Sequence, residues 1–160
     1  MERYHKIIDH VMFREYMDRI ELLEKDRIFC RHNVTHLLDV ARIAYIMNLE
    51  KGASYSKDII YGAALLHDIG KPEQYEEQIP HEITGAKKAA AVLQDCGYEE
   101  EEILLIQTAI SDHRRGPEEG NRMLSELLYE ADKKSRMCLF CHAKEECNWS
   151  EDKKNMRILV

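Results

Sequence analysis

Apolar residues recur at helical spacing along most of the chain. In the first segment they follow steps of three and four residues from Ile7 to Leu23, which is the stripe of an amphipathic helix. The same period returns in the later segments, and no window alternates with the period of two that strands show. The sequence therefore predicts an all-α protein.

Capping and helix-breaking residues indicate where the helices begin and end. We expect Asp26 to cap a second helix that ends at Gly52, and Ser56 to cap a third that ends near Ile69. A polar stretch, 73–80, should then separate the third helix from the next. Three further helices are expected at about 82–96, 99–113 and 121–134.

These six main helices are expected to form a single helical bundle over residues 1–160. No linker divides the chain, and 160 residues suffice for one hydrophobic core without disulfides. We place the core of the domain at about 26–136. Residues 137–160 are expected to be a cysteine-containing extension packed on the bundle.

The charge balance narrows the classes of partner. A net charge of −7 would repel a phosphate backbone, so we expect no nucleic-acid polymer as a partner, although a local basic pocket for a small phosphate ester fits. No apolar run approaches the ~18–20 residues of a membrane span. The first residues also lack the apolar stretch of a signal peptide, so we expect a cytoplasmic protein with no membrane partner.

Several histidine and aspartate side chains are candidate ligands for a metal ion. His67 and Asp68 close the apolar run Tyr61–Leu66, where two polar side chains need a reason. An imidazole beside a carboxylate suits iron, manganese or zinc, although such a pair alone more often caps a helix. Further members stand on the inner faces or ends of other expected helices: His36, His81, His113 and Asp132. A helical bundle that delivers ligands from several helices in this way can build a metal centre.

In order and context, these residues resemble the ligands of the HD-domain metal-dependent phosphohydrolase superfamily. His36, His67-Asp68 and Asp132 match its four signature positions, and the stretch from His67 to Lys71 is similar to its HDIG motif. His81 and His113 match the two additional histidines of the subgroup with two metals. That subgroup includes bacterial symmetrical diadenosine-tetraphosphate hydrolases.

The resemblance implies a dinuclear centre. One ion would be held by His36, His67, Asp68 and Asp132, and Asp68 would bridge to a second ion held by His81 and His113. The ions would be two divalent transition metals, with iron or manganese favoured and zinc or nickel as alternatives. Two such ions ~3.5–4 Å apart can activate a water and polarise a phosphoryl oxygen.

His32 competes with His36, because it lies one helical turn earlier in the chain. The family spacing, in which Val40 and Ala41 follow the histidine, fits His36. We therefore expect His32 to have a supporting or structural role.

Three basic residues near the motifs are candidates for contact with substrate. Lys71 is expected to act beside Asp68 in catalysis and to contact a substrate phosphate, with a solvated lysine as the alternative. Arg114 and Arg115 could line the mouth of the site, although loop arginines are usually solvated. Glu82 could carry a proton, but acids in the first turn usually serve the helix dipole.

The cysteines form a separate pattern. An odd number, five, in a reducing compartment favours metal ligands or buried thiols over disulfides. Cys138 and Cys141 form a two-residue-spaced hook, with Cys147 close behind. A fourth ligand from Cys30, His32 or His142 would complete a separate structural zinc site, and buried free thiols are the alternative.

The resemblance implies hydrolysis of a phosphate ester or phosphoanhydride by a metal-activated water. The substrate would be a small phosphorylated molecule, nucleotide-like in character. An alternative is a mixed-valent di-iron oxygenase of the same family, because the six ligands are shared. A non-catalytic binding module fits less well, since no ligand position is missing.

Overall fold

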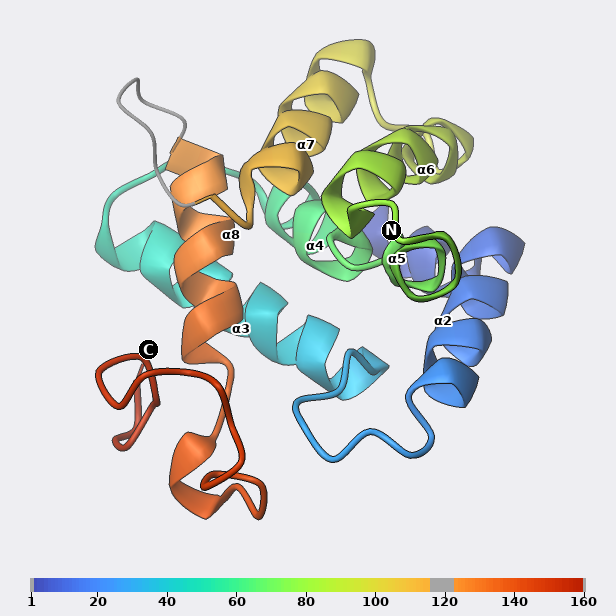
Figure 1. Cartoon of the computed structure of the whole chain (residues 1–160). Helices are drawn as coiled ribbons and strands as arrows, with labels where there is room; N and C mark the ends of the chain where they lie inside the picture. The colour runs from blue at the N-terminus through green and yellow to red at the C-terminus, as the bar shows by residue number, and fades with distance from the viewer. Residues whose placement is uncertain (1, 116–122, 160) are drawn as a thin grey trace.

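The computed structural model describes residues 2–115 and 123–159. Within these residues the chain contains eight α-helices and no strand, which confirms the predicted all-α class (Figure 1). The helices are α1 (Tyr4–Asp9), α2 (Val11–Leu23), α3 (Val34–Glu50), α4 (Lys57–Leu66), α5 (Lys71–Glu77), α6 (His81–Asp95), α7 (Glu100–Asp112) and α8 (Met123–Lys134). In the described part of the chain, no helix has the length and apolar character needed to cross a membrane.

Helix α4 is the centre of the bundle. Its residues from Ile59 to Leu66 are buried almost without exception, and it packs against α3, α7, α1, α6 and α8 (Figure 1). Ser56 caps its start, as predicted, by accepting a hydrogen bond from the backbone N–H of Ile59. Because neighbours surround α4, the polar residues after Leu66 emerge inside the bundle rather than at its surface.

The single first helix that we predicted from Ile7 to Leu23 is wrong. His10 has extended backbone and separates α1 from α2, and its Nδ1 accepts a hydrogen bond of 3.2 Å from the N–H of Met12. The side-chain cap at His10 starts a new helix in a different direction. The expected stripe is broken as well, since Val11 is 69% exposed.

The predicted cap of the second helix is also wrong. Helix α3 begins at Val34, and its cap is Asn33, whose side chain accepts a hydrogen bond of 3.0 Å from the N–H of His36. Residues 27–33 run as an irregular loop instead, which places Asp26 well before the helix. This loop carries Cys30 and His32, and it lies at the end of the molecule where the chain after α8 also lies (Figure 1).

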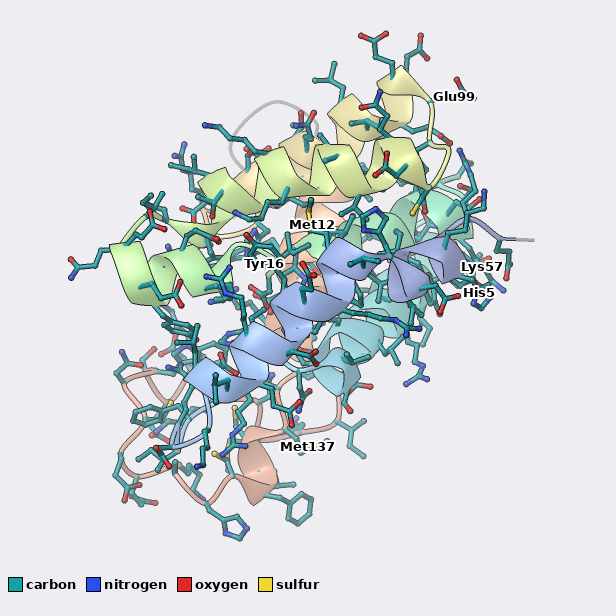
Figure 2. All side chains as sticks on the ribbon, turned by 90° about the vertical axis from the view of Figure 1, so that its right-hand side faces the viewer. His5, Met12, Tyr16, Lys57, Glu99 and Met137 are labelled. Carbon is teal, nitrogen blue, oxygen red and sulfur yellow. The ribbon has the colours of Figure 1, made fainter. Side chains whose placement is uncertain are left out.

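The polar stretch over 73–80 was expected to be a connection, but most of it belongs to α5. Pro72 fits the first turn of this helix, where no intrahelical N–H bond is lost. Its buried Glu73 accepts a hydrogen bond of 3.1 Å from the Tyr16 hydroxyl and lies 3.1 Å from Lys88 Nζ. Figure 2 shows Tyr16 on the side of α2 that faces α5 and α6. Packing between helices therefore stabilises α5, whose own sequence has no apolar stripe.

Gly70 sets the distance between the end of α4 and the start of α6. A Cβ at this position would lie 2.2 Å from the His81 carbonyl oxygen and 2.6 Å from the Gly85 nitrogen. Only glycine allows the two backbones to approach this closely. The contact brings the first residue of α6 beside the turn that follows α4.

The ends of the later helices agree closely with prediction. Helices α6 and α7 lie within a residue of the expected ranges, and α8 ends at Lys134 as expected. The predicted start of the last helix, Asn121, lies outside the described residues.

The chain after α8 is irregular apart from a short 3-10 helix, Cys138–Phe140. The side chain of Asn155 donates hydrogen bonds of 2.6 and 2.8 Å to the carbonyls of Lys133 and Arg136, which fold the segment back toward α8. In Figure 1 this segment lies at the same end of the molecule as the loop before α3. The guanidinium of Arg136 joins the two, since it donates a 2.7 Å hydrogen bond to the Arg31 carbonyl.

Candidate metal centre

The fold brings together all six residues that the sequence singled out as metal ligands. Each comes from the inner face or the end of a different helix, except for the adjacent pair after α4, and five of the six are buried. They are His36 on α3, His67 and Asp68 after α4, His81 at the start of α6, His113 after α7 and Asp132 on α8.

The carboxylate of Asp68 lies at the centre of this cluster. Its Oδ2 is 3.0 Å from His67 Nε2 and 3.4 Å from His36 Nε2. Its other oxygen, Oδ1, is 3.2 Å from His81 Nε2. The two oxygens therefore face two different sets of imidazoles, which is the arrangement that a bridging carboxylate needs.

Two overlapping groups of donor atoms can each hold a cation. In one, His36, His67 and Asp132 place ligand atoms within 4.8 Å of one another, and in the other His67, Asp68 and His113 do so. His81 joins the second group, because its Nε2 lies 3.1 Å from His113 Nε2. Neutral imidazoles and carboxylates in this number suit a divalent transition metal.

The two histidines at helix ends are oriented by their own helices. His67 Nδ1 lies 2.7 Å from the Ala64 carbonyl oxygen, and His113 Nδ1 lies 2.6 Å from the Ile110 carbonyl oxygen. Because a carbonyl can only accept, each Nδ1 carries a proton, and Nε2 is the nitrogen of each ring that is left for a metal. Both rings are thus set in the tautomer that binds a metal through Nε2.

The other two histidines have side-chain partners. His81 Nδ1 is hydrogen-bonded to the side-chain oxygen of Gln74, and His36 Nδ1 lies 3.2 Å from the Ser135 hydroxyl. On its other side, His36 Nε2 accepts a 3.1 Å hydrogen bond from the Arg136 guanidinium. A metal at His36 would need this lone pair, so Arg136 would have to turn away from it.

Two buried polar atoms test whether a cation fits here. In the described part of the chain, His67 Nε2 and Asp68 Oδ2 have no hydrogen-bond partner, although they lie 3.0 Å apart. A buried polar atom without a partner costs about 1–3 kcal/mol, so this arrangement needs a compensating group. A cation bound between the two atoms would satisfy both, and the donor set therefore fits a metal.

The electrostatics favour a positive charge at the same place. Burial opposes ionisation of Asp68, but His67 and the other neighbouring histidines, together with Lys71, outweigh burial and hold the pKa of Asp68 well below its ordinary value. Burial likewise lowers the pKa of His67, but its interactions with Asp68 and Asp132 together outweigh burial and raise the pKa to about 10. Burial lowers the pKa of His113 to about 3, so its imidazole stays neutral. A metal would replace the proton that the two buried carboxylates otherwise draw onto His67.

His32 lies beside this centre without joining either group of ligand atoms in the described residues. Its ring Nδ1 is hydrogen-bonded to the buried carboxylate of Glu24. The same carboxylate accepts hydrogen bonds of 2.8 Å from the backbone N–H of His32 and 2.6 Å from the Tyr75 hydroxyl. The His32 ring is 5.8 Å from the ring of His36. Glu24 and Tyr75 are partners that the sequence did not reveal, since neither belongs to a recognisable motif.

A pocket of about 530 Å³ opens over the metal centre. Asp68, His81, His113 and Asp132 line it, as does Trp149 from the C-terminal segment. A volume of this size is ordinary for a small-molecule site.

The three basic candidates are placed differently. Lys71 is buried in the wall of the pocket, with Nζ 3.8 Å from Asp68 Oδ1. Arg114 also lines the pocket, and its guanidinium donates a 3.3 Å hydrogen bond to Glu82. Arg115 is exposed and is not among the lining residues.

Sequence reasoning missed most of the positive charge in this pocket. The lysines and arginines that line it, among the described residues, are Arg27, Lys71, Arg114, Lys133, Arg136, Lys144 and Lys154. Apart from Lys71 and Arg114, which the sequence singled out, these residues lie in loops or at a helix end, where no spacing marks them as neighbours. The described acids that line the pocket are Asp68 and Asp132, which are themselves candidate metal ligands.

Comparison with known proteins agrees with the geometry. The family model described as "HD domain" matches residues 33–141, a range that contains all six candidate ligands. An uncharacterized protein from Clostridium beijerinckii is 44% identical over 158 residues, which cover 99% of each chain.

A solved structure supports the fold. The crystal structure of a predicted HD superfamily hydrolase from an uncultured Thermotogales bacterium has a TM-score of 0.62 to this chain and 22% sequence identity. The match covers 89% of this chain and 81% of the other. At this identity, the likeness establishes a shared helical architecture.

Proposed function

This chain belongs to the HD domain family, and on that premise we propose that it is a metal-dependent phosphohydrolase acting on a small nucleotide-like substrate. The bond cleaved would be a phosphate ester or a phosphoanhydride. Support comes from the six candidate ligands and from the pocket above them.

The charge of the pocket is the observation that carries the proposal. Seven cationic side chains surround a cavity whose described carboxylates are both metal-ligand candidates, although the whole chain has a net charge of −7. A concave site lined by one sign of charge concentrates ligands of the opposite sign. A substrate with one or more phosphates matches this field, whereas a neutral polyol would not make use of it.

The aromatic lining favours a nucleotide among phosphorylated substrates. Phe29 and Trp149 both line the cavity, one from the loop before α3 and one from the C-terminal segment. Flat aromatic side chains can stack on a base, while lysines and arginines bind the phosphates. The proposal therefore places the base toward the loops and the reacting phosphate over the histidines.

Two divalent metals would be held by the residues already described. His36, His67, Asp68 and Asp132 would bind one, and Asp68 would share the second with His81 and His113. When bound, such a pair activates a water and offsets charge on the phosphoryl oxygens.

The remaining steps fall to the side chains of the chain itself. Lys71 is buried beside Asp68 and would contact the phosphoryl group as negative charge develops on it. Arg114 is oriented by Glu82 at the pocket wall, where it can bind a more distant phosphate. Arg136 can exchange its contact with His36 for a contact with substrate when a metal occupies that site.

The reaction class is tested without oxygen. Manganese-loaded protein is assayed anaerobically on nucleotides, dinucleoside polyphosphates and simple phosphate esters, and we expect phosphate or nucleotide release. Activation of water needs no electron transfer, so neither the missing oxygen nor the redox-stable metal should matter.

The matched control is Asp68→Ala, which should show no release. No release by the wild type on any of these substrates, together with oxygen consumption by iron-loaded protein on a polyol or phosphonate, would reject the hydrolase and favour the di-iron oxygenase.

A further inference from the structure

Four of the five cysteines lie in one region of the molecule. Cys30 belongs to the loop before α3, and Cys138, Cys141 and Cys147 belong to the C-terminal segment, yet all four line the same pocket. The fifth, Cys96, is buried at the end of α6, where its carbonyl accepts a hydrogen bond from Lys6. We propose that the four clustered cysteines bind a structural Zn²⁺ that joins the C-terminal segment to the loop before α3.

The backbone brings the first two thiols together. Cys138 begins the 3-10 turn, and the N–H of Cys141 donates a 3.1 Å hydrogen bond to the Cys138 carbonyl. This tight turn folds the hook so that both cysteines line the pocket. Two thiolates with two residues between them are a frequent half of a zinc site.

Two arginines hold the loop that carries Cys30 close to the hook formed by Cys138 and Cys141. Arg27 Nε donates a 2.8 Å hydrogen bond to the Cys30 carbonyl, which fixes the loop at that residue. Arg136, two residues before the hook, donates a 2.7 Å hydrogen bond to the carbonyl of Arg31. The chain is therefore tied beside Cys30 on one side and beside Cys138 on the other.

The structure selects Cys30 among the three candidates for the fourth ligand. The Nδ1 of His32 is committed to Glu24 beneath the metal centre, and His142 is exposed and does not line the pocket. Cys30 alone of the three lines the pocket without a side-chain partner of this kind. The donor set is therefore four sulfurs, which is a common set for structural zinc.

The C-terminal segment needs a cross-link of this kind. Among residues 135–159, Cys138 and Ala143 are the buried residues, whereas Phe140 is 76% exposed and Ile158 is 84% exposed. Apolar burial contributes little here, and small or irregular segments are often stabilised by a bound metal instead. A metal bound to the four thiols would supply folding free energy directly.

Zinc binding would also draw the sulfurs closer. In the described residues, the groups of ligand atoms that lie within 4.8 Å of one another belong to the histidine centre, by which we mean the six candidate ligands around Asp68. The described cysteines form no such group, so their thiols must rotate inward to bind a metal. The four thiols would bind as thiolates and release their protons to solvent. Arg136, Lys144 and Lys154 line the same pocket and would offset the resulting negative charge.

Cobalt substitution tests the site in the full-length protein. Co²⁺ bound to thiolates gives an intense sulfur-to-metal charge-transfer absorption in the near ultraviolet, whereas Co²⁺ bound to histidines and carboxylates does not. We expect this absorption in the wild type, its loss in Cys138→Ser/Cys141→Ser, and its retention in the matched control Cys96→Ser. Elemental analysis should show one zinc ion fewer in the double variant.

Two further measurements keep the test independent of folding and of the proposed function. Zinc should protect four thiols of the wild type from maleimide, and removal of the zinc should restore their reaction. Asp68→Ala should keep the cobalt–thiolate absorption, because it disturbs the histidine centre alone. Absence of the absorption from the wild type, or equal maleimide reaction with and without zinc, would overturn the proposal.

Discussion

The histidine centre and the cysteine cluster line the same pocket but are held by different kinds of structure. The histidine centre draws its ligands from helices packed around α4, and His67 and His113 are oriented by carbonyls of their own last turns. The cysteine cluster draws its ligands from loops, and three of its four thiols are half-exposed. In the first region the fold positions the ligands, and in the second we infer that the metal positions the chain.

This difference separates the consequences of losing each metal. Removal of the metals from the histidine centre should abolish activity and leave the helices folded, because their packing does not depend on the ions. Removal of zinc from the cysteines should loosen the segment after α8 and leave the histidine ligands in place.

Asp68→Ala should have the largest effect on the histidine centre. Each oxygen of this carboxylate faces a different set of imidazoles, so its loss would remove a ligand from both of the proposed metals. We expect both ions to be lost and activity to fall by at least ~10³-fold, a loss of about 4 kcal/mol of transition-state stabilisation. Elemental analysis and the phosphohydrolase assay measure the two effects.

His113→Ala is the comparison for Asp68→Ala. His113 faces the second group of ligands, so this variant should retain one ion. Equal metal loss in the two variants would count against a bridging role for Asp68.

Gly70→Ala should move His81, at the start of α6, away from Asp68, which follows α4. The added Cβ would lie 2.2 Å from the His81 carbonyl oxygen and 2.6 Å from the Gly85 nitrogen, and these backbone atoms cannot move aside as the end of a flexible side chain could. We expect the start of α6 to shift away from Asp68, with loss of the second metal and a fall in activity of ~10²-fold, as for a misplaced reacting group. The first metal should remain.

Gly52→Ala serves as the control for this variant. No atom lies within 4 Å of a Cβ at Gly52, but its φ of +66° favours glycine, so the control reports backbone strain without a clash at the site. Loss of stability alone is expected there. If Gly70→Ala kept both metals, the proposed spacing role of Gly70 would be wrong.

The sequence could predict most of the histidine centre because its ligands interrupt helical patterns. His67 and His113 each follow an apolar run, and a polar side chain at the end of a buried helix is conspicuous in a linear pattern. Helix α5 could not be predicted in the same way. Its stability depends on tertiary contacts such as the one between Tyr16 and Glu73, and periodicity does not record these.

The pocket could be predicted far less well than the centre beneath it. Arg136 and Lys144 reach it from irregular chain, whose path is set by contacts such as that of Asn155 with the end of α8. The choice of Cys30 among three fourth-ligand candidates likewise depended on where the loop before α3 runs. Spacing along the chain can predict that Cys138 and Cys141 form a pair of ligands, but it cannot show which distant loop lies beside them.

Glu24→Gln should test the loop between the two clusters. Burial alone would raise the pKa of Glu24, but its interactions with His32 and Tyr75 together outweigh burial and lower the pKa to about 2. A carboxylate with a lowered pKa stabilises the fold above its unfolded pKa, and this contribution is lost as the pH falls through the folded value. We expect a cost of about 1–3 kcal/mol at neutral pH for this buried group.

Chemical denaturation between pH 7 and pH 3 measures this effect. The difference in unfolding free energy between wild type and Glu24→Gln should be constant near neutrality and shrink below the ordinary glutamate pKa. Tyr75→Phe, which removes one neutral partner of Glu24, should cost less and show a weaker dependence on pH. A pH-independent difference for Glu24→Gln would contradict the charged contact.

The smallest expected effect is a change in KM, and it is measured by comparing alanine variants of two adjacent arginines, Arg114 and Arg115. Both arginines are exposed, but Arg114 lines the cavity and is oriented by Glu82, whereas Arg115 does not line it, so the two alanine variants remove the same charge from neighbouring positions. If Arg114 binds a substrate phosphate, Arg114→Ala should raise KM by ~10-fold, which corresponds to about 1.4 kcal/mol. Arg115→Ala should leave KM nearly unchanged, because its charge is screened by solvent and salt. Steady-state kinetics at two salt concentrations would measure both, and equal changes in KM would mean that the general positive field of the region, rather than a contact by Arg114, attracts the substrate.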